Sequence, residues 1–301
     1  MSTAIHDIGY RHYDGPRLGR AHTVRALYQY NLRSVFGLGR GPRAKILPMM
    51  MVAFMLLPAA GDIAILSFAR TPEALIDYSM YAFYLQMIIA IFLATQAPVI
   101  ASRDQRFRTV PLYFSRPVGA WDFVLAKFAA FVTALLLLVA VPVTLLHLGF
   151  LTMRGTMIEH GSKGVPSVVD QTGYYLAALV GCLLLALVLS SFALLIAAFT
   201  PRRGFGVAAV MAVYLISNVV VLIIQVVSLG NGDYDLAGWA NLLTPFRLVD
   251  GVQARLLGAD IGVRGDSVPP AGSGPVFLLG CLAVIGGSLA LLTRRFRKAG
   301  A

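Results

Sequence analysis

The chain has 301 residues, of which 58% are hydrophobic and only 13% are charged. Mean hydropathy is +0.76, and six apolar stretches are long enough to cross a bilayer, which excludes a soluble domain and predicts an all-α polytopic membrane protein. The formal net charge of +11 is segregated into particular loops, a distribution that argues against nucleic-acid binding.

Residues 1–45 form a basic segment ahead of the first apolar stretch. They lack the apolar run and cleavage site of a signal peptide, so the first span is expected to act as an uncleaved anchor. Apolar residues recur in the segment at helical spacing: Val24, Leu27, Tyr28, Leu32, Val35 and Phe36. This pattern predicts an amphipathic helix over 20–36 in the inner headgroup region, ended by Gly37 and Gly39. The alternative is a basic flank that only sets the orientation of the chain.

A transmembrane domain is expected at 46–293, followed by a basic cytoplasmic tail at 294–301. Its six predicted spans are 46–68, 80–101, 124–150, 174–199, 204–229 and 275–293. At 1.5 Å per residue, each is long enough for a hydrocarbon core about 30 Å thick. Of the 25 Lys and Arg residues, 19 fall in the segments on one side of the membrane and six in those on the other. The positive-inside rule therefore predicts that both termini lie on the cytoplasmic face of the cell membrane.

Ionisable residues are rare within the spans. Asp62 follows Pro58 and Gly61 near the outer end of the first span. A carboxylate in hydrocarbon is costly, so we expect Asp62 to face the outer water; the alternative is an acid that lines a cavity or a gate. His147 lies near the outer end of the third span and is expected to be a polar terminus.

Amide side chains also occur in the spans, at Gln86, Gln96, Asn218 and Gln225. An amide in hydrocarbon needs a partner, so these residues should face a cavity or another helix. Asn218 and Gln225 are seven residues apart and share one face of the fifth span. Gln86 and Gln96 lie within about 80° of each other on the second span. The residues alone leave both roles open, a cavity lining or simple packing between helices.

The longest outer segment, 230–274, contains its own helical pattern. Apolar residues follow Pro245 on one helical face: Phe246, Val249, Val252 and Leu256. This pattern predicts a short amphipathic helix that lies at the outer surface or dips back into the membrane. The Gly-, Pro- and Ser-rich stretch at 262–275 is expected to be a flexible return.

Motifs for catalysis or nucleotide binding are absent from the sequence. There is no G-x-x-x-x-G-K-[ST], H-E-x-x-H or G-x-S-x-G pattern, so no nucleotide site, zinc-protease site or serine nucleophile is predicted. Cys182 and Cys281 both lie within apolar runs, and neither a disulfide framework nor a structural zinc site is expected. No cluster of ionisable residues suggests a membrane-embedded enzyme, and no broken helix with midplane charges suggests a secondary transporter.

The basic loop at 102–127 interleaves charged and aromatic residues: Arg103, Asp104, Arg106, Phe107, Arg108, Tyr113, Phe114, Arg116, Trp121, Asp122 and Phe123. Solvated loops seldom contain so many aromatic residues among charges, so we expect this loop to dock on another surface. A second interpretation, compatible with the first, places Tyr113, Trp121 and Phe123 at the headgroup level as an aromatic belt.

This loop resembles the segment after the second membrane helix of ABC-2-type transporter permeases. The residues that carry the resemblance are Asp104, Thr109, Leu112, Phe114, Ser115, Arg116, Pro117, Phe123 and Lys127. The six-span layout extends the likeness from about residue 20 to 298. One departure is that Asp104 is followed by Gln105 and Arg106, where the family commonly has a glutamate followed by a small residue.

The resemblance implies a membrane subunit that is driven by a separate P-loop ATPase, present in two copies that carry the ATP and magnesium; the chain itself would bind no cofactor. It also implies a homodimer with a second permease copy. The implied coupling surface starts with a short helix and comprises Asp104, Arg106, Arg108, Thr109 and Arg116. The implied substrate path comprises Gln86, Gln96, Asn218 and Gln225, with Asp62 as a further candidate.

The apolar composition of the spans favours export of a small hydrophobic or amphipathic compound, such as an antibiotic or a lipid-like metabolite. The alternatives are a polysaccharide or lipid export permease of the same type, and a stand-alone secondary transporter.

Overall fold

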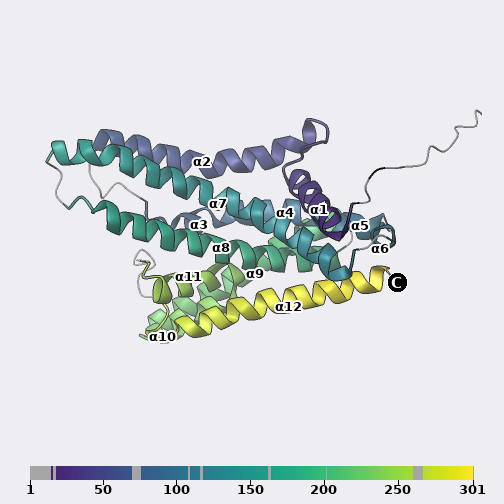
Figure 1. The fold of residues 1–301 in the computed structure, drawn as a ribbon. Coiled ribbons are helices and arrows are strands. Elements are labelled where there is room, and N and C mark those ends of the chain that lie inside the picture. Colours follow the sequence, from purple (N-terminus) through teal and green to yellow (C-terminus); the bar gives the residue numbers. More distant parts are fainter. Residues whose placement is uncertain are drawn as a thin grey trace, which may run out of the picture.

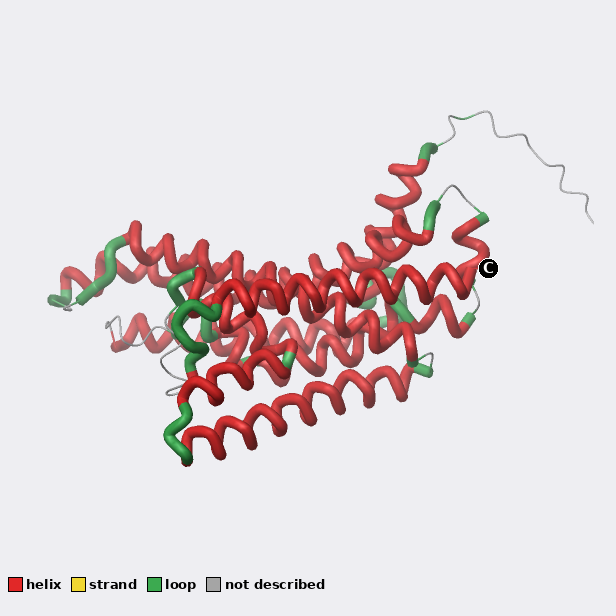
Figure 2. The backbone as a smooth tube through the Cα atoms, turned by 90° about the horizontal axis from the view of Figure 1, so that it is seen from below, coloured by secondary structure: helices red, strands yellow, loops and turns green. Residues whose placement is uncertain are grey.

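In the computed structural model, the residues described are 15, 18–69, 76–107, 109–115, 118–161, 164–200, 202–259 and 267–300. Every regular element among them is helical (Figure 2). Six helices are long and apolar enough to cross a membrane, and they run side by side (Figure 1). They are α2 (Arg43–Ala69), α4 (Gln86–Ile100), α7 (Ala120–Glu159), α8 (Val168–Phe199), α9 (Arg203–Gly230) and α12 (Gly274–Gly300). The predicted class, an all-α polytopic protein, is confirmed.

The short helices gather at the two ends of this bundle (Figure 1). One end, which we call the charged end, carries α1 (Arg20–Val35), α5 (Ser102–Arg106), α6 (Val110–Phe114) and the last turns of α12. The opposite end carries α10 (Tyr234–Trp239), η2 (Ala240–Leu243) and α11 (Pro245–Leu256). Most basic segments therefore lie at one end, as the alternation of inner and outer loops predicts.

The predicted N-terminal amphipathic helix is present as α1, and it packs on the bundle. Its buried residues include Leu27 and Val35, and the Tyr28 hydroxyl donates a 3.1 Å hydrogen bond to Thr133 on α7. The helix ends where predicted, because Gly37 has a φ of +67°. That conformation strains any residue with a Cβ, and a Cβ at Gly37 would also collide with the backbone oxygen of Ala44.

Two predicted boundaries differ from the structure. The second span is broken at Leu85, with the short α3 (Tyr81–Tyr84) before it and α4 after it. The segment between the predicted third and fourth spans, 151–173, is largely helical, because α7 continues to Glu159 and α8 begins at Val168. The apolar side chain of Met157 on this extension is buried against residues near the ends of the helices, including Leu66 on α2. Burial of apolar surface thus extends the helices beyond the length that a bilayer requires.

Burial divides the six long helices into a centre and a periphery. The apolar windows of α4, α7 and α8 are 67%, 56% and 56% buried, whereas those of α2, α9 and α12 are 28%, 17% and 28% buried. The outer helices consequently present apolar side chains to lipid or to another chain.

The predicted helix after Pro245 is confirmed as α11, which packs against α8 and α12. Phe246, Val249 and Val252 are buried as the pattern indicates, while Leu256 is 47% exposed at the helix end. Asp250 is buried as well, so the polar side of this helix is partly covered. The helix α11 therefore lies against the long helices α8 and α12.

Candidate docking site at the charged end

The loop between the second and third long helices folds into two short helices that are anchored on the bundle. The Ser102 hydroxyl, at the start of α5, donates hydrogen bonds of 2.7 and 3.1 Å to the backbone oxygens of Ala197 and Thr200. These carbonyls belong to the last turn of α8 and the residue after it, where the i to i+4 hydrogen bonds of the helix end. The loop is therefore fastened to a helix almost a hundred residues away in the sequence.

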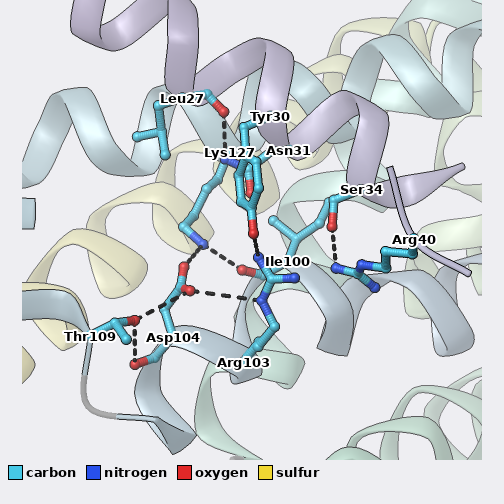
Figure 3. A network of polar contacts seen from close by, with 10 residues as sticks. All are labelled: Leu27, Tyr30, Asn31, Ser34, Arg40, Ile100, Arg103, Asp104, Thr109 and Lys127. Atoms are coloured by element: carbon cyan, nitrogen blue, oxygen red, sulfur yellow. Dashed lines mark hydrogen bonds and ion pairs between the residues drawn. The ribbon is translucent and has the colours of Figure 1, made fainter. Parts of the chain in front are cut away.

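Asp104 and Lys127 form a buried ion pair behind this loop (Figure 3). The Lys127 Nζ lies 2.5 Å from Asp104 Oδ2 and donates a second hydrogen bond to the backbone oxygen of Ile100. The two side chains are only 3% and 9% exposed. The Thr109 hydroxyl lies 3.4 Å from Oδ1, the other oxygen of the Asp104 carboxylate. The pair joins the loop to the first turns of α7.

This geometry changes the role of one predicted interface residue. The resemblance implies an Asp104 that pairs with the ATPase, whereas its carboxylate is already bonded within the chain. Charge reversal at Asp104 would leave Lys127 buried without its counter-ion, so it would disturb the loop itself rather than only a surface contact.

An aromatic cluster holds α6 against α7 and α12. Phe123 is fully buried at its centre, with ring centroids 5.1 Å from Tyr113, 5.8 Å from Phe114 and 5.2 Å from Phe296. The expectation that Phe123 belongs to an aromatic belt at the headgroups is therefore wrong, because α12 covers its ring. Trp121, which is 47% exposed, remains in a position suited to that belt.

The helix α1 contacts both the loop helix α5 and the start of α7. Arg20 donates hydrogen bonds of 2.8 and 2.7 Å to the Asp122 carboxylate at the start of α7. Arg103 on α5 donates to the Tyr30 hydroxyl, and its guanidinium carbon lies 5.3 Å from the Tyr30 ring centroid. The three elements α1, α5 and α7 are thus connected by polar contacts between side chains (Figure 3).

Between α1 and α6 lies a largely apolar groove of about 410 Å³. Its lining residues are Thr23, Ala26, Leu27, Tyr30, Thr109, Leu112, Tyr113 and Val118. Leu112 is 68% exposed and Tyr30 is 50% exposed. An exposed apolar concavity at the charged end of a membrane bundle has the character of a protein-binding surface. We call it the α1–α6 groove.

The other predicted interface residues fall into two groups. Arg106 is exposed at the surface, and its guanidinium carbon lies 5.6 Å from the ring centroid of Phe107. Thr109 lines the α1–α6 groove while its hydroxyl is directed to Asp104. Arg108 and Arg116 lie outside the described residues.

The predicted substrate-path residues are not gathered in one place. Asp62 is 4% exposed and accepts a 3.4 Å hydrogen bond from the backbone N–H of Ile76. The expectation that it faces outer water is therefore wrong, because the chain returning to α3 covers it. Gln86 begins α4 just after the break at Leu85 and borders a narrow cavity with Tyr78 and Asp250, among others. Its Oε1 is buried and has no hydrogen-bond partner among the described residues.

Gln96 and Asn218 each form a hydrogen bond within their own helix. Gln96 is buried, and its Nε2 donates a 3.3 Å hydrogen bond to the adjacent Thr95 hydroxyl. Asn218 donates a 2.9 Å hydrogen bond to the backbone oxygen of Tyr214, one turn earlier. The Asn218 Oδ1 is buried without a partner in the described part of the chain. Neither contact links one long helix to another.

Gln225 has a different surrounding, since it joins α9 to the short helices at the opposite end. Its Nε2 donates to the Ala237 backbone oxygen and to Asn241 Oδ1, both at 3.2 Å. Its Oε1 accepts a 2.9 Å hydrogen bond from Arg247 on α11. These contacts favour the packing alternative for Gln225.

A buried aromatic cluster lies toward the opposite end, and the helical periodicity of the sequence does not predict it. His147 is 6% exposed, and its ring stacks on Tyr175 with a centroid distance of 4.3 Å. The Tyr78 hydroxyl lies 3.4 Å from His147 Nδ1 and accepts a 2.9 Å hydrogen bond from Gln171. Burial raises the pKa of Tyr78 to about 12, which keeps this hydroxyl neutral at ordinary pH. His147 is therefore not the polar terminus that the sequence predicts.

Comparison of the sequence with protein-family models finds no match, and neither does comparison with curated proteins. The arrangement of the site is therefore the basis on which the function is inferred. It offers an exposed apolar groove at the charged end, and behind that groove a buried ion pair connects the loop to a central helix.

Proposed function

We propose that this chain is the membrane subunit of an ABC-type exporter, and that a separate P-loop ATPase binds the α1–α6 groove. The observation that carries the proposal is the connection between the groove and the bundle. Leu112 and Tyr113 line the groove on α6, and Tyr113 packs on the same Phe123 of α7 that contacts α12. A force applied at the groove would reach two long helices through packed side chains, because packed interiors transmit strain.

The charge pattern supports the same partner. Arg106 stands exposed on α5, the helix whose Arg103 contacts Tyr30 of the groove, so an acidic patch on the ATPase would complement it and steer the encounter. The groove itself offers apolar area for the centre of the interface, with Leu112 and Tyr30 as exposed anchors. This combination of an apolar centre and a charged rim is the usual anatomy of a protein interface.

The experiment is co-purification with a candidate P-loop ATPase, such as one whose reading frame neighbours this gene. Leu112→Glu places a charge in the apolar groove, and we expect it to weaken retention of the ATPase by about tenfold or more. Leu18→Glu is the matched control, because Leu18 is 60% exposed near the start of α1 and does not line the groove. Both variants should remain monodisperse in detergent. Equal retention by the two variants would contradict the proposed interface.

Arg106→Glu tests whether the exposed side of α5 contributes to coupling. We expect it to reduce substrate-stimulated ATP hydrolysis while the variant inserts normally, because the residue is exposed and forms no ion pair with the described residues. Unchanged stimulated ATPase activity would remove Arg106 from the interface.

We further propose that two copies of the chain assemble and that they export a small hydrophobic or amphipathic molecule. The 17% burial of α9 leaves an apolar face available for a symmetric partner. Differently tagged copies should co-purify, and recovery of monomers alone would refute the homodimer. Deletion of the gene should increase cellular retention of lipophilic compounds; loss of a surface glycan without such a change would favour polysaccharide export instead.

A further inference from the structure

A second groove runs along the other side of α1, where this helix meets the start of α7. Its volume is about 740 Å³. Its apolar walls are Ala21 and Val24 on α1 and Leu125, Ala126 and Ala129 on α7. Leu125 is 45% exposed, and Ala21 and Ala129 are exposed, so the groove is open to the surroundings of the bundle. We call it the α1–α7 groove.

One uncompensated cation borders this apolar surface. Arg20 and Arg25 both line the groove, but Arg20 is held by two hydrogen bonds to Asp122. Arg25 is exposed, and within the described residues it forms no ion pair. Across 18–50 the sequence has six Lys and Arg residues and no Asp or Glu. The local field therefore favours an anion beside Arg25.

The position of the groove along the bundle matches the boundary of a membrane. It begins where α7 enters its apolar stretch, next to the exposed indole of Trp121, and tryptophan favours the headgroup level. From Asp122 to Ala129 the groove extends about 10 Å along α7. This length spans the headgroup region and the first part of an acyl chain.

We propose that the α1–α7 groove binds one anionic membrane phospholipid, with its phosphate at Arg25 and an acyl chain against the apolar residues of α7. A soluble anion would leave the apolar walls uncovered, whereas a neutral amphiphile would leave Arg25 without a counter-ion. Only a molecule with both parts satisfies the whole groove. The inference requires this end of the bundle to lie at a membrane surface, and it does not depend on the identity of the partner ATPase.

The bound lipid would also hold α1 in place. The residues of α1 that line the α1–α6 groove include Thr23, Ala26 and Tyr30, and those that line the α1–α7 groove include Ala21 and Val24. The two sets occupy different sides of one helix. An amphiphile on one side therefore supports the wall that the proposed ATPase contacts on the other.

The test uses the full chain in nanodiscs made from equal amounts of phosphatidylglycerol and phosphatidylcholine. After gentle detergent extraction, native mass spectrometry counts the lipids retained on each protein molecule. We expect the wild type to retain phosphatidylglycerol in preference to phosphatidylcholine. Arg25→Gln should lower phosphatidylglycerol retention about fivefold. Arg33→Gln removes the same charge from an exposed position of α1 outside the groove, and should leave retention unchanged.

A second variant separates the groove from general attraction between charges. Ala129→Phe fills the apolar end of the groove at an exposed position, so it should displace the lipid although Arg25 is intact. Equal losses with Arg25→Gln and Arg33→Gln would show diffuse attraction and overturn the proposal. Normal retention by Ala129→Phe, or equal retention of both lipids by the wild type, would also overturn it.

Discussion

Lys127 illustrates how a charge is accommodated inside a membrane bundle. Its ammonium has Asp104 as counter-ion and the Ile100 carbonyl as a further acceptor. It also lies 4.7 Å from the ring centroid of Phe123 and 5.9 Å from that of Phe296, where the faces of aromatic rings attract cations. Such compensation offsets the cost of burying the charge, and this cost returns when one partner is removed.

At the residue scale, we therefore predict that Lys127→Met destabilises the protein more than any exposed lysine substitution. The carboxylate of Asp104 would remain buried without a counter-ion, at a cost on the order of 3–5 kcal/mol. Thermal unfolding in detergent measures the effect. Lys298→Met is the control, since Lys298 is exposed at the same end.

The double variant Asp104→Leu/Lys127→Met provides the complementary test. It removes both charges, so it should be more stable than Lys127→Met alone. A double variant less stable than either single variant would argue against a coupled pair.

At the scale of elements, the short helices at the opposite end depend on α9. Gln225 contacts Ala237, Asn241 and Arg247 through both ends of its amide. The Ser217 hydroxyl donates a 3.1 Å hydrogen bond to the Thr244 hydroxyl, just before α11. These contacts span 12 to 27 residues in sequence and fix α10 and α11 against one face of α9.

We predict that Gln225→Leu loosens this attachment. The substitution leaves buried polar groups on Asn241 and Arg247 without one partner, which costs about 1–3 kcal/mol. Hydrogen exchange should accelerate in 234–256 and remain unchanged in α7. Unaltered exchange in that segment would contradict the proposed attachment.

Asn218→Leu is a matched control that should not destabilise the protein. Among the described residues, the Asn218 Nδ2 donates to a carbonyl of its own helix, and its Oδ1 is buried without a partner. Removing an unsatisfied amide should leave stability unchanged or raise it. A loss comparable to that of Gln225→Leu would indicate a partner from outside the chain.

At the scale of the whole molecule, the bundle has a central layer and a peripheral one. The central helices α4, α7 and α8 carry most of the buried apolar residues, while α2, α9 and α12 surround them with largely exposed apolar faces. Charge differs along the length of the bundle, between the charged end and the end that carries α10 and α11. The exposed apolar faces of the peripheral helices indicate where lipid or a second copy lies. The difference in charge between the two ends indicates how the bundle is oriented in the membrane.

We predict that the charged end faces the cytoplasm. Cysteine labelling in intact cells can test this, because Cys182 and Cys281 are both buried and should react weakly. A cysteine at exposed Tyr234, on α10, should react with a membrane-impermeant maleimide added outside. A cysteine at exposed Lys298 should react only after the cells are opened. The reverse pattern would invert the topology.

The sequence by itself determined the class of the protein, the number of long helices and the end at which basic residues collect. These properties depend on local composition, since a bilayer requires about twenty apolar residues in each span and attracts basic loops to one face. The amphipathic helices α1 and α11 were equally predictable, because 3.6-residue periodicity is visible within one segment.

Only the tertiary structure decided how the polar residues are used. Asp104 binds Lys127 across 23 residues, and His147 contacts Tyr78 and Tyr175, which come from other segments of the chain. Spacing along one helix reports which face a residue occupies, but not which element covers that face. The burial of Asp62, the packing role of Gln225 and the two grooves of α1 each arise from contacts between distant segments, and those contacts exist only when the helices are packed.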